Sequence, residues 1–170
     1  RLVAAYHRVR DGLGFRMHAS RFGALPIDAY SHSPASGGAR QPGMTGQVKE
    51  ELLARRIELG VRFENGSLHF RPPLLLDEEW LASPTEWTIP GREETTVPLA
   101  ADTLAFQCCG VPVVYHRHAS ASEIEIEFAS GERRTFPGDR IDADLTRRIC
   151  GRTGDVDRIH VRIGSVGPTG

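Results

Sequence analysis

The sequence has almost no excess of charge of either sign and no long apolar run. Its 21 Lys and Arg residues and 22 Asp and Glu residues are well mixed, with a formal net charge of -1. This balance provides no basic surface for nucleic acid or for an anionic membrane. No apolar run approaches the roughly 20 residues that span a bilayer, and no charged and then apolar leader precedes a cleavage site. We therefore expect a soluble, cytoplasmic protein with neither nucleic acid nor membrane among its partners.

Cysteine is also scarce, because the chain has only 3, of which Cys108 and Cys109 are adjacent and Cys150 is distant. An odd and uneven set does not form a disulfide framework, which favours a reducing compartment. Cys108 and Cys109 lie in an apolar run with no basic partner evident, so small buried residues are a better interpretation than nucleophiles. No internal repeat is present, and the 18 Gly and 11 Pro are scattered as turn markers.

The first residues, RLVAAYHRVRDG, predict a helix that has no N-terminal cap of its own. Leu2, Val3, Tyr6 and Val9 share one stripe, and Gly12 is a natural stop. The stripe needs a partner, and a helix without an N-terminal cap is typical of a chain cut from a longer polypeptide; a trimmed, frayed start is the alternative. We expect the remainder of a longer chain to be a partner.

Residues 15–44 show no periodic spacing of apolar residues, and the most clearly predicted helix of the chain follows them. Loops of this length are uncommon in compact domains and tend to be functional or disordered; the aromatics Phe15, Phe22 and Tyr30 favour an ordered loop packed by its own side chains. Beyond the loop a helix is predicted from Thr45, its natural N-cap, to Gly60, a typical left-handed C-terminal residue. Apolar residues recur along it at three- and four-residue spacings: Val48, Leu52, Leu53, Ile57 and Leu59.

The rest of the chain has strand patterns. VRFENGSLHF predicts a hairpin with Asn65-Gly66 at its turn, in which Phe63 faces Leu68, Val61 faces Phe70, and all four lie on one buried face. DTLAFQCCGVPVVYHR is typical of one long strand that bends near Gly110 and Pro112. EIEIEF and DRIHVRI alternate, with Ile124, Ile126, Phe128, Ile159, Val161 and Ile163 inward. IDADLTRRIC is either a short helical turn or another strand.

The start of the helix at Thr45 is the strongest candidate for chemistry. The first amides of a helix have no internal partner and lie at the positive end of its dipole, so they suit a phosphate, a carboxylate or a polarised hydroxyl. Thr45 and Gly46 fit this role, and His32, Arg40 and Gln41 in the preceding loop add groups that bind a sugar or an oxyanion. The alternative is that Thr45 only caps the helix and the loop packs locally.

The segment TGQVKEELLARRIELGVRFENGSLHFRPPLLLDEEW, residues 45–80, resembles the end of the catalytic barrel in glycoside phosphorylases of the cellobiose and chitobiose phosphorylase type. In that family a Thr-Gly opens a late helix, which ends in a Leu-Gly-aliphatic step before a short hairpin, a proline, a tryptophan and a small β-tail. The resemblance implies an (α/α)6 barrel in which Thr45 and Gly46 line a phosphate pocket. It also implies that the general acid lies earlier in the barrel, outside this chain, and hydrolysis stays open beside phosphorolysis.

These observations together predict an α+β protein: the last helices of an (α/α)6-type barrel in residues 1–60, followed by an antiparallel β-sandwich-like tail in residues 61–170. The predicted function is the C-terminal portion of a carbohydrate-active enzyme, inactive by itself, whose loop 24–46 lines the pocket for an oligosaccharide, with inorganic phosphate as a further candidate. Tyr30 would stack on a sugar ring, and His32, Arg40, Gln41, Thr45 and Gly46 would bind substrate.

The alternative function is a non-catalytic β-sandwich accessory or carbohydrate-binding module, for which Trp80, Trp87 and Tyr115 are the aromatics free to serve. A purely structural domain is a third possibility. Asp28 is the one acid considered for catalysis, although a turn-forming Asp is the better interpretation. His116 and His118 would share one face of a strand, but no third ligand with suitable spacing appears, so we expect neither a metal nor a cofactor.

Overall fold

The computed structural model describes residues 1–13, 45–91 and 95–164, with the side chains of residues 13, 45–48 and 50 left out of the description. The chain divides into two compact units, Arg1–Glu58 and Leu59–Gly170. The first unit contains the helices α1 (Leu2–Leu13) and α3 (Thr45–Glu58). Among the described residues, no helix has the length and apolar character required to cross a bilayer.

Polar side chains connect the two helices of the first unit. Glu58 is buried and accepts hydrogen bonds from Tyr6 Oη at 2.8 Å and from Arg10 Nε at 3.2 Å. Burial alone would raise the pKa of Glu58, but hydrogen bonds from Tyr6 and Arg55 and the charge of Arg10 outweigh it, so the pKa is lowered. Large apolar side chains of these helices are instead exposed: Leu2, Val3, Val9, Leu52, Leu53 and Ile57.

The second unit is mainly β. Its strands are β1 (Val61–Glu64), β2 (Ser67–Phe70), β3 (Thr85–Thr88), β4 (Thr96–Leu99), β5 (Thr103–Cys108), β6 (Val111–Ala119), β7 (Glu123–Phe128), β8 (Arg133–Pro137), β9 (Arg140–Ile141) and β10 (Val156–Gly164). A 3-10 turn, η1 (Asp77–Glu79), and one helix, α4 (Ala143–Cys150), complete it. The strands form a five-stranded sheet in the order β5-β6-β10-β7-β8, a three-stranded sheet β1-β2-β9 and a two-stranded sheet β3-β4.

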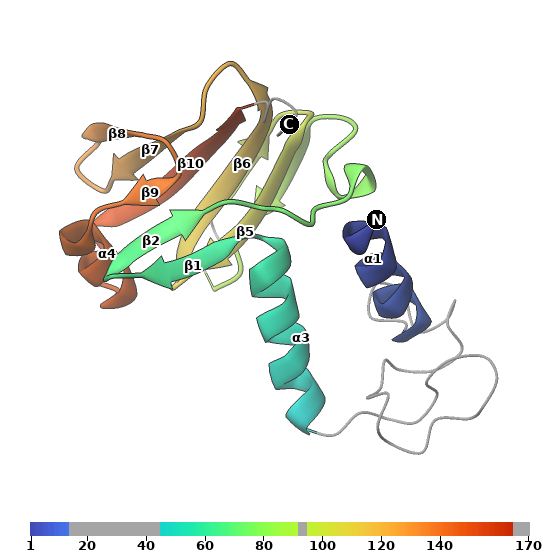
Figure 1. Cartoon of the computed structure of the whole chain (residues 1–170). Coiled ribbons are helices and arrows are strands. Elements are labelled where there is room, and N and C mark those ends of the chain that lie inside the picture. The colour runs from blue at the N-terminus through green and yellow to red at the C-terminus, as the bar shows by residue number, and fades with distance from the viewer. Residues whose placement is uncertain (14–44, 92–94, 165–170) are drawn as a thin grey trace. The chain divides into compact units, whose positions relative to one another are not determined.

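The last strand enters the middle of the largest sheet. β10 lies between β6 and β7 (Figure 1), parallel to β6 and antiparallel to β7. A parallel neighbour requires a crossover connection, and the chain between β6 and β10 contains β7, β8, β9 and α4. β6 and β10 are therefore neighbours in the sheet although residues 120–155 separate them in the sequence.

The main core lies between one face of the five-stranded sheet and a layer made of β1, β2, β9 and α4. Its fully buried side chains include Leu68, Phe70, Tyr115, Ile124, Ile126, Ile141, Leu145, Ile149 and Ile159. A smaller cluster on the other face packs the β3-β4 hairpin against β6 through Ile89, Val97, Leu99 and Val114. Beyond Val114, that second face carries polar side chains of β6, β7 and β10.

The predicted fold class is wrong. The α+β arrangement was expected to combine the last helices of an (α/α)6 barrel with an antiparallel β-sandwich-like tail. In the described part of the chain only α1, α3 and α4 are α-helices, strands predominate, and no barrel of helical hairpins is evident. The largest sheet is also mixed, because β10 runs parallel to β6. An amphipathic pattern identifies a helix but leaves open what the helix packs against, so one helix could not establish a barrel.

The predicted hairpin is confirmed in register but not in burial. Val61 pairs with Phe70 and Phe63 with Leu68, and the turn residues Asn65 and Gly66 have φ of 49° and 77°. Phe63, however, is 44% exposed, so the expectation that it shares the buried face is wrong. Phe63 lies on β1, the edge strand of the three-stranded sheet, whereas its buried partner Leu68 lies on β2, between β1 and β9.

Two further segments were predicted incorrectly or left undecided from the sequence. Residues 102–117 do not form one bent strand, because β5 and β6 are separated by a tight turn at Cys109 and Gly110, whose φ values are 53° and 82°. The segment IDADLTRRIC contains a helix, α4. Its N-cap Asp142 accepts a hydrogen bond from the Leu145 amide at 2.8 Å, which satisfies one of the free amides of the first turn.

Candidate functional site

The polar side chains opposite the main core surround a hollow of about 520 Å³. We name this surface the histidine face. Its lining residues are His116, Arg117, Ala119, Glu125, Glu127, Arg133, Arg158, His160 and Arg162. They come from β6, β7, β8 and β10, the four strands of the five-stranded sheet that follow β5.

Strand alternation explains why these residues share one face. In β10, Ile159 and Val161 point into the core, so His160 and Arg162 point the other way. The parallel register places Arg162 beside His116 of β6, and the antiparallel register places His160 beside Glu125 of β7. The histidine face is therefore assembled from strands that meet only in the folded sheet.

Two histidines at the centre of the face are hydrogen-bonded to each other. His116 Nε2 lies 3.0 Å from His160 Nδ1, so one ring donates a proton that the other accepts. Burial, then the charges of His116 and Arg158, lower the pKa of His160 from 6.5 to about 4. Burial and the charge of Arg162 lower the pKa of His116 as well. Both rings are therefore neutral at pH 7.

Ion pairs connect the charged residues around the histidines. The pairs are Arg162–Glu123 (2.6 Å), Arg162–Glu125 (3.5 Å), Arg133–Glu125 (3.4 Å), Arg133–Glu127 (3.1 Å) and Arg158–Glu127 (3.8 Å). Four arginines line the hollow against two glutamates, so its lining carries excess positive charge. Such a surface favours an anionic ligand.

Arg158 has the loosest contacts of these arginines. Its ion pairs, to Glu127 and to Asp157, are 3.8 and 4.0 Å long. Its Nε is buried and has no hydrogen-bond partner within the described residues. A buried donor without a partner is costly. Arg158 also lines the hollow, where a ligand oxygen could accept from its guanidinium. Arg158 is thus the arginine best placed to bind such an oxygen.

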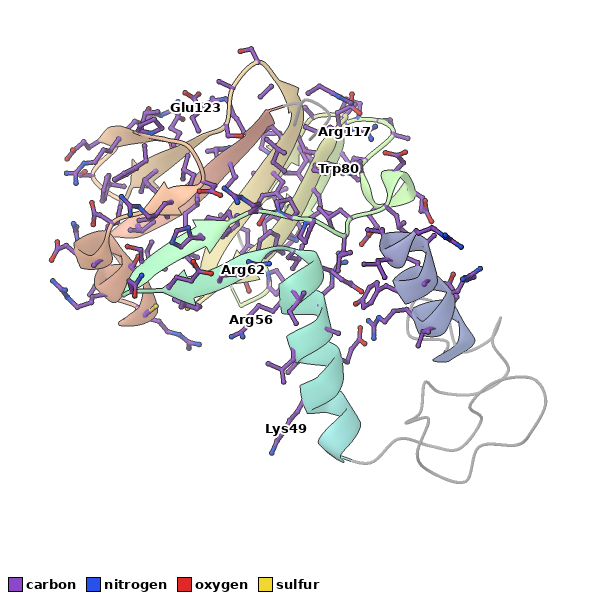
Figure 2. All side chains as sticks on the ribbon, viewed as in Figure 1. Lys49, Arg56, Arg62, Trp80, Arg117 and Glu123 are labelled. Carbon is purple, nitrogen blue, oxygen red and sulfur yellow. The ribbon has the colours of Figure 1, made fainter. Side chains whose placement is uncertain are left out.

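Arg117 forms the border of the face beside Trp80. Its Nε donates to Asp102 at 2.7 Å, and its guanidinium lies 5.5 Å from the centroid of the Trp80 ring. Figure 2 shows the two labelled side chains next to each other, with Glu123 on a different part of the sheet. The guanidinium of Arg117 therefore covers one face of the Trp80 ring.

A second cavity of about 410 Å³ opens at the end of β10. Its lining is largely apolar and includes Phe70, Pro72 and Val161. Asp139 is its single lining carboxylate and pairs with Arg71 at 2.7 Å. Glycoside hydrolysis usually requires two carboxyl groups on either side of the bond, and this cavity does not provide them.

The structure changes the interpretation of the histidine motif. His116 and His118 do not share a strand face: His118 is exposed and has φ of 64°, which breaks the alternation, while His116 pairs with His160. Within the described residues no group of three or more His, Cys, Asp or Glu side chains could hold a metal ion.

Most of the predicted site lies outside the described residues. This applies to Tyr30, His32, Arg40 and Gln41, and to Asp28. Thr45 and Gly46 are the first two residues of α3, as predicted, but their side chains are not described. These assignments stay predictions.

The expectation for Tyr115 is wrong. Tyr115 is fully buried, and its hydroxyl donates to the carbonyl oxygen of Leu59 at 2.6 Å, so it cannot serve as a sugar platform.

Sequence reasoning missed Arg158, His160 and Arg162. Their signal was present in DRIHVRI, because the alternation that directs Ile159 and Val161 inward directs these three polar residues outward. Their neighbour His116 is 44 residues away in sequence, and no local pattern joins the two strands.

Comparisons with known proteins add no family assignment. No protein-family model matches the chain, and no curated protein sequence matches it. The functional interpretation therefore depends on the geometry of the histidine face and on the resemblance of residues 45–80.

Proposed function

We propose that the β-rich unit is a non-catalytic accessory module of a carbohydrate-active enzyme, and that it binds an anionic carbohydrate on the histidine face. The observation that carries the proposal concerns Arg158. This residue lines a hollow whose lining has more arginines than glutamates, and its buried Nε lacks a hydrogen-bond partner in the described residues. A carboxylate or phosphate group on a sugar supplies the oxygen atoms that an arginine binds.

The geometry supports binding more than catalysis. The glutamates of the hollow, Glu125 and Glu127, form ion pairs with arginines, whereas a general acid needs a carboxyl group that holds its proton near neutral pH. His116 and His160 are neutral and can donate and accept hydrogen bonds to sugar hydroxyls. A ligand with hydroxyl groups and one negative charge uses both sets of side chains.

The aromatic residues argue against a neutral polysaccharide as the ligand. Phe70, Tyr115 and Phe128 are buried in the main core, and Trp80 packs against Arg117. No flat aromatic platform is therefore present on the histidine face for stacking a sugar ring. Affinity must come from charge and hydrogen bonds, which favours an acidic or phosphorylated sugar.

The test is isothermal titration calorimetry of the whole chain with four ligands: a uronic-acid disaccharide, a hexose phosphate, inorganic phosphate and a neutral disaccharide. We expect the anionic sugars to bind and the neutral disaccharide not to bind. Arg158→Gln should weaken the binding about tenfold or more, since a hydrogen bond to a charged group contributes roughly 1.5–3 kcal/mol.

Arg147→Gln is the matched control, because Arg147 is an exposed arginine of α4 that does not line the hollow. It removes the same charge and should leave affinity unchanged beyond a small screening effect. Equal weakening by both substitutions, or binding of the neutral disaccharide alone, would disprove an anion site at Arg158.

A second candidate is the enzyme pocket implied by the resemblance, with loop 24–46, Thr45 and Gly46 binding an oligosaccharide and phosphate. The start of α3 at Thr45 supports it, since the first amides of a helix have no internal partner and suit a phosphate. Phosphate binding that Thr45→Ala abolishes and Arg158→Gln leaves intact would support this candidate. In both candidates we propose a cytoplasmic location.

A further inference from the structure

Two cysteines that are distant in sequence lie together in the β-rich unit. Cys109 is in the tight turn between β5 and β6 and has φ of 53°. Cys150 is the last residue of α4. Both are free thiols; Cys150 is exposed and Cys109 is half-buried. Cys109 lines one small cavity together with Ile149, the neighbour of Cys150, and its side chain is close enough to raise the pKa of the Cys150 thiol.

The cavity that Cys109 lines is small. Its volume is about 140 Å³, and its lining includes Cys109 and Ile149, the residue that precedes Cys150. Arg148 and Arg152 line the same cavity. The thiolate is the form of cysteine that reacts with oxidants. The cavity gives a small oxidant access to Cys109, and Cys150 is itself exposed.

We propose that Cys109 and Cys150 are a redox modification site that forms a reversible intramolecular disulfide when a hydroperoxide oxidises the protein. The site is independent of the proposed ligand on the histidine face. The thiol of Cys150 has a raised pKa, caused by burial and by its contact with Cys109. That effect agrees with two thiols close enough to react.

The chemistry is balanced with the hydroperoxide as oxidant. One thiolate attacks the peroxide oxygen, the O–O bond breaks, and a sulfenic acid forms as an alcohol or water leaves. The second thiol attacks the sulfenic sulfur, and water leaves as the S–S bond forms. The two thiols lose two hydrogen atoms in total, and the peroxide is reduced by two electrons.

The bridge would connect two elements that contribute to the core. The turn at Cys109 joins β5 to β6, and α4 covers the core through Leu145 and Ile149. Closing the long loop between Cys109 and Cys150 restricts the unfolded chain and stabilises the folded unit. We expect oxidation to raise the Tm by about 10 °C.

The test uses the whole chain, treated with hydrogen peroxide, then alkylated, digested and analysed by mass spectrometry. The expected product is a peptide pair joined through Cys109 and Cys150, lacking two hydrogen atoms and released by dithiothreitol. Cys109→Ser and Cys150→Ser should each abolish the bridge and the rise in Tm. Cys108→Ala is the control, because it removes the neighbouring buried cysteine and should leave the bridge intact.

Three results would overturn the proposal. One is a bridge between Cys108 and Cys150, and another is a disulfide-linked dimer through the exposed Cys150. The third is full alkylation of Cys109 and Cys150 after peroxide treatment, in protein shown to be folded by circular dichroism. Thermal unfolding of the reduced variants verifies that the serine substitutions leave the fold intact.

Discussion

Gly60, near the start of the β-rich unit, has a backbone conformation that few other residues adopt. Its φ is 67°, and a Cβ atom placed there would lie 2.0 Å from the carbonyl carbon and oxygen of Arg71. The Arg71 amide donates to the Gly60 carbonyl at 3.0 Å, so the two backbone segments are held against each other. Glycine is required here both by the positive φ and by the close approach.

We predict that Gly60→Ala destabilises the β-rich unit by more than about 3 kcal/mol, because the left-handed strain of roughly 1–2 kcal/mol adds to a backbone clash. Gly110→Ala is the control: its φ is 82°, but no atom lies within 4 Å of the added Cβ, so strain alone acts. Urea unfolding of both variants measures the difference. Equal losses would show that the contact with Arg71 has no effect.

His160 predicts a dependence of stability on pH. Its pKa is about 4 in the folded protein and 6.5 in the unfolded chain, so the unfolded chain binds a proton first as the pH falls. The contribution to stability is complete above pH 6.5 and decreases between pH 6.5 and 4. Allowing for solvent screening at this half-buried site, the loss is on the order of 1–2 kcal/mol.

The measurement is the free energy of unfolding at pH 7, 6, 5 and 4. His160→Gln should reduce its decrease over this range. His118→Asn should not, because His118 is exposed and asparagine tolerates its positive φ. The same pH dependence in His160→Gln as in the unchanged protein would contradict the assignment.

At the scale of elements, α4 is joined to the three-stranded sheet by one buried hydroxyl. Thr146 Oγ1 accepts a hydrogen bond from the Leu68 amide of β2 at 2.9 Å, and both residues are buried. β9, the neighbouring strand of β2, contains only two residues, Arg140 and Ile141. The hydroxyl therefore satisfies a backbone donor for which the short strand provides no acceptor.

We predict that Thr146→Val lowers the free energy of unfolding by about 1–3 kcal/mol, because it leaves the Leu68 amide buried without an acceptor while keeping the side-chain shape. Thr135→Val, at an exposed position of β8, is the control and should change stability little. Urea unfolding with hydrogen exchange of the Leu68 amide measures both effects. An unchanged exchange rate in Thr146→Val would show that the hydrogen bond contributes nothing.

At the scale of the whole molecule, the two units differ in how they are stabilised. The β-rich unit has an extensive apolar core of its own, whereas the Arg1–Glu58 unit buries His7, Arg10 and Glu58 and exposes six large apolar side chains. Hydrophobic burial is the main source of folding free energy. Among the described residues, the β-rich unit thus has the larger share of the hydrophobic burial.

We predict that residues 59–170 expressed alone unfold in one cooperative transition, with a Tm close to that of the β-rich unit in the whole chain. The fragment should begin at Leu59, because its carbonyl accepts the hydrogen bond from the buried Tyr115 hydroxyl. Calorimetry and near-UV circular dichroism measure the transition. A fragment without a cooperative transition would show that residues 1–58 are needed for folding.

Local patterns in the sequence predicted several elements correctly. The helix from Thr45, the Asn65-Gly66 turn and the alternation of Ile124, Ile126 and Phe128 all depend on neighbours within a few residues. Backbone propensity, capping and side-chain periodicity act over that range, so the elements that depend on them can be predicted from the sequence without knowledge of the tertiary structure. The site predicted at Tyr30 to Gly46 stays a prediction, since its side chains lie outside the description.

The sequence by itself thus determined the helix from Thr45, the Asn65-Gly66 turn and the inward faces of β7 and β10. The tertiary structure alone decided that β10 lies between β6 and β7, that His160 meets His116, and that the turn at Cys109 lies beside the end of α4. These contacts join residues about 40 positions apart, and the alternation of a strand is the same whichever strand lies beside it. Which strands pair depends on how all the elements pack around the core. For this reason the barrel expected from one helix was wrong, and the histidine face was missed.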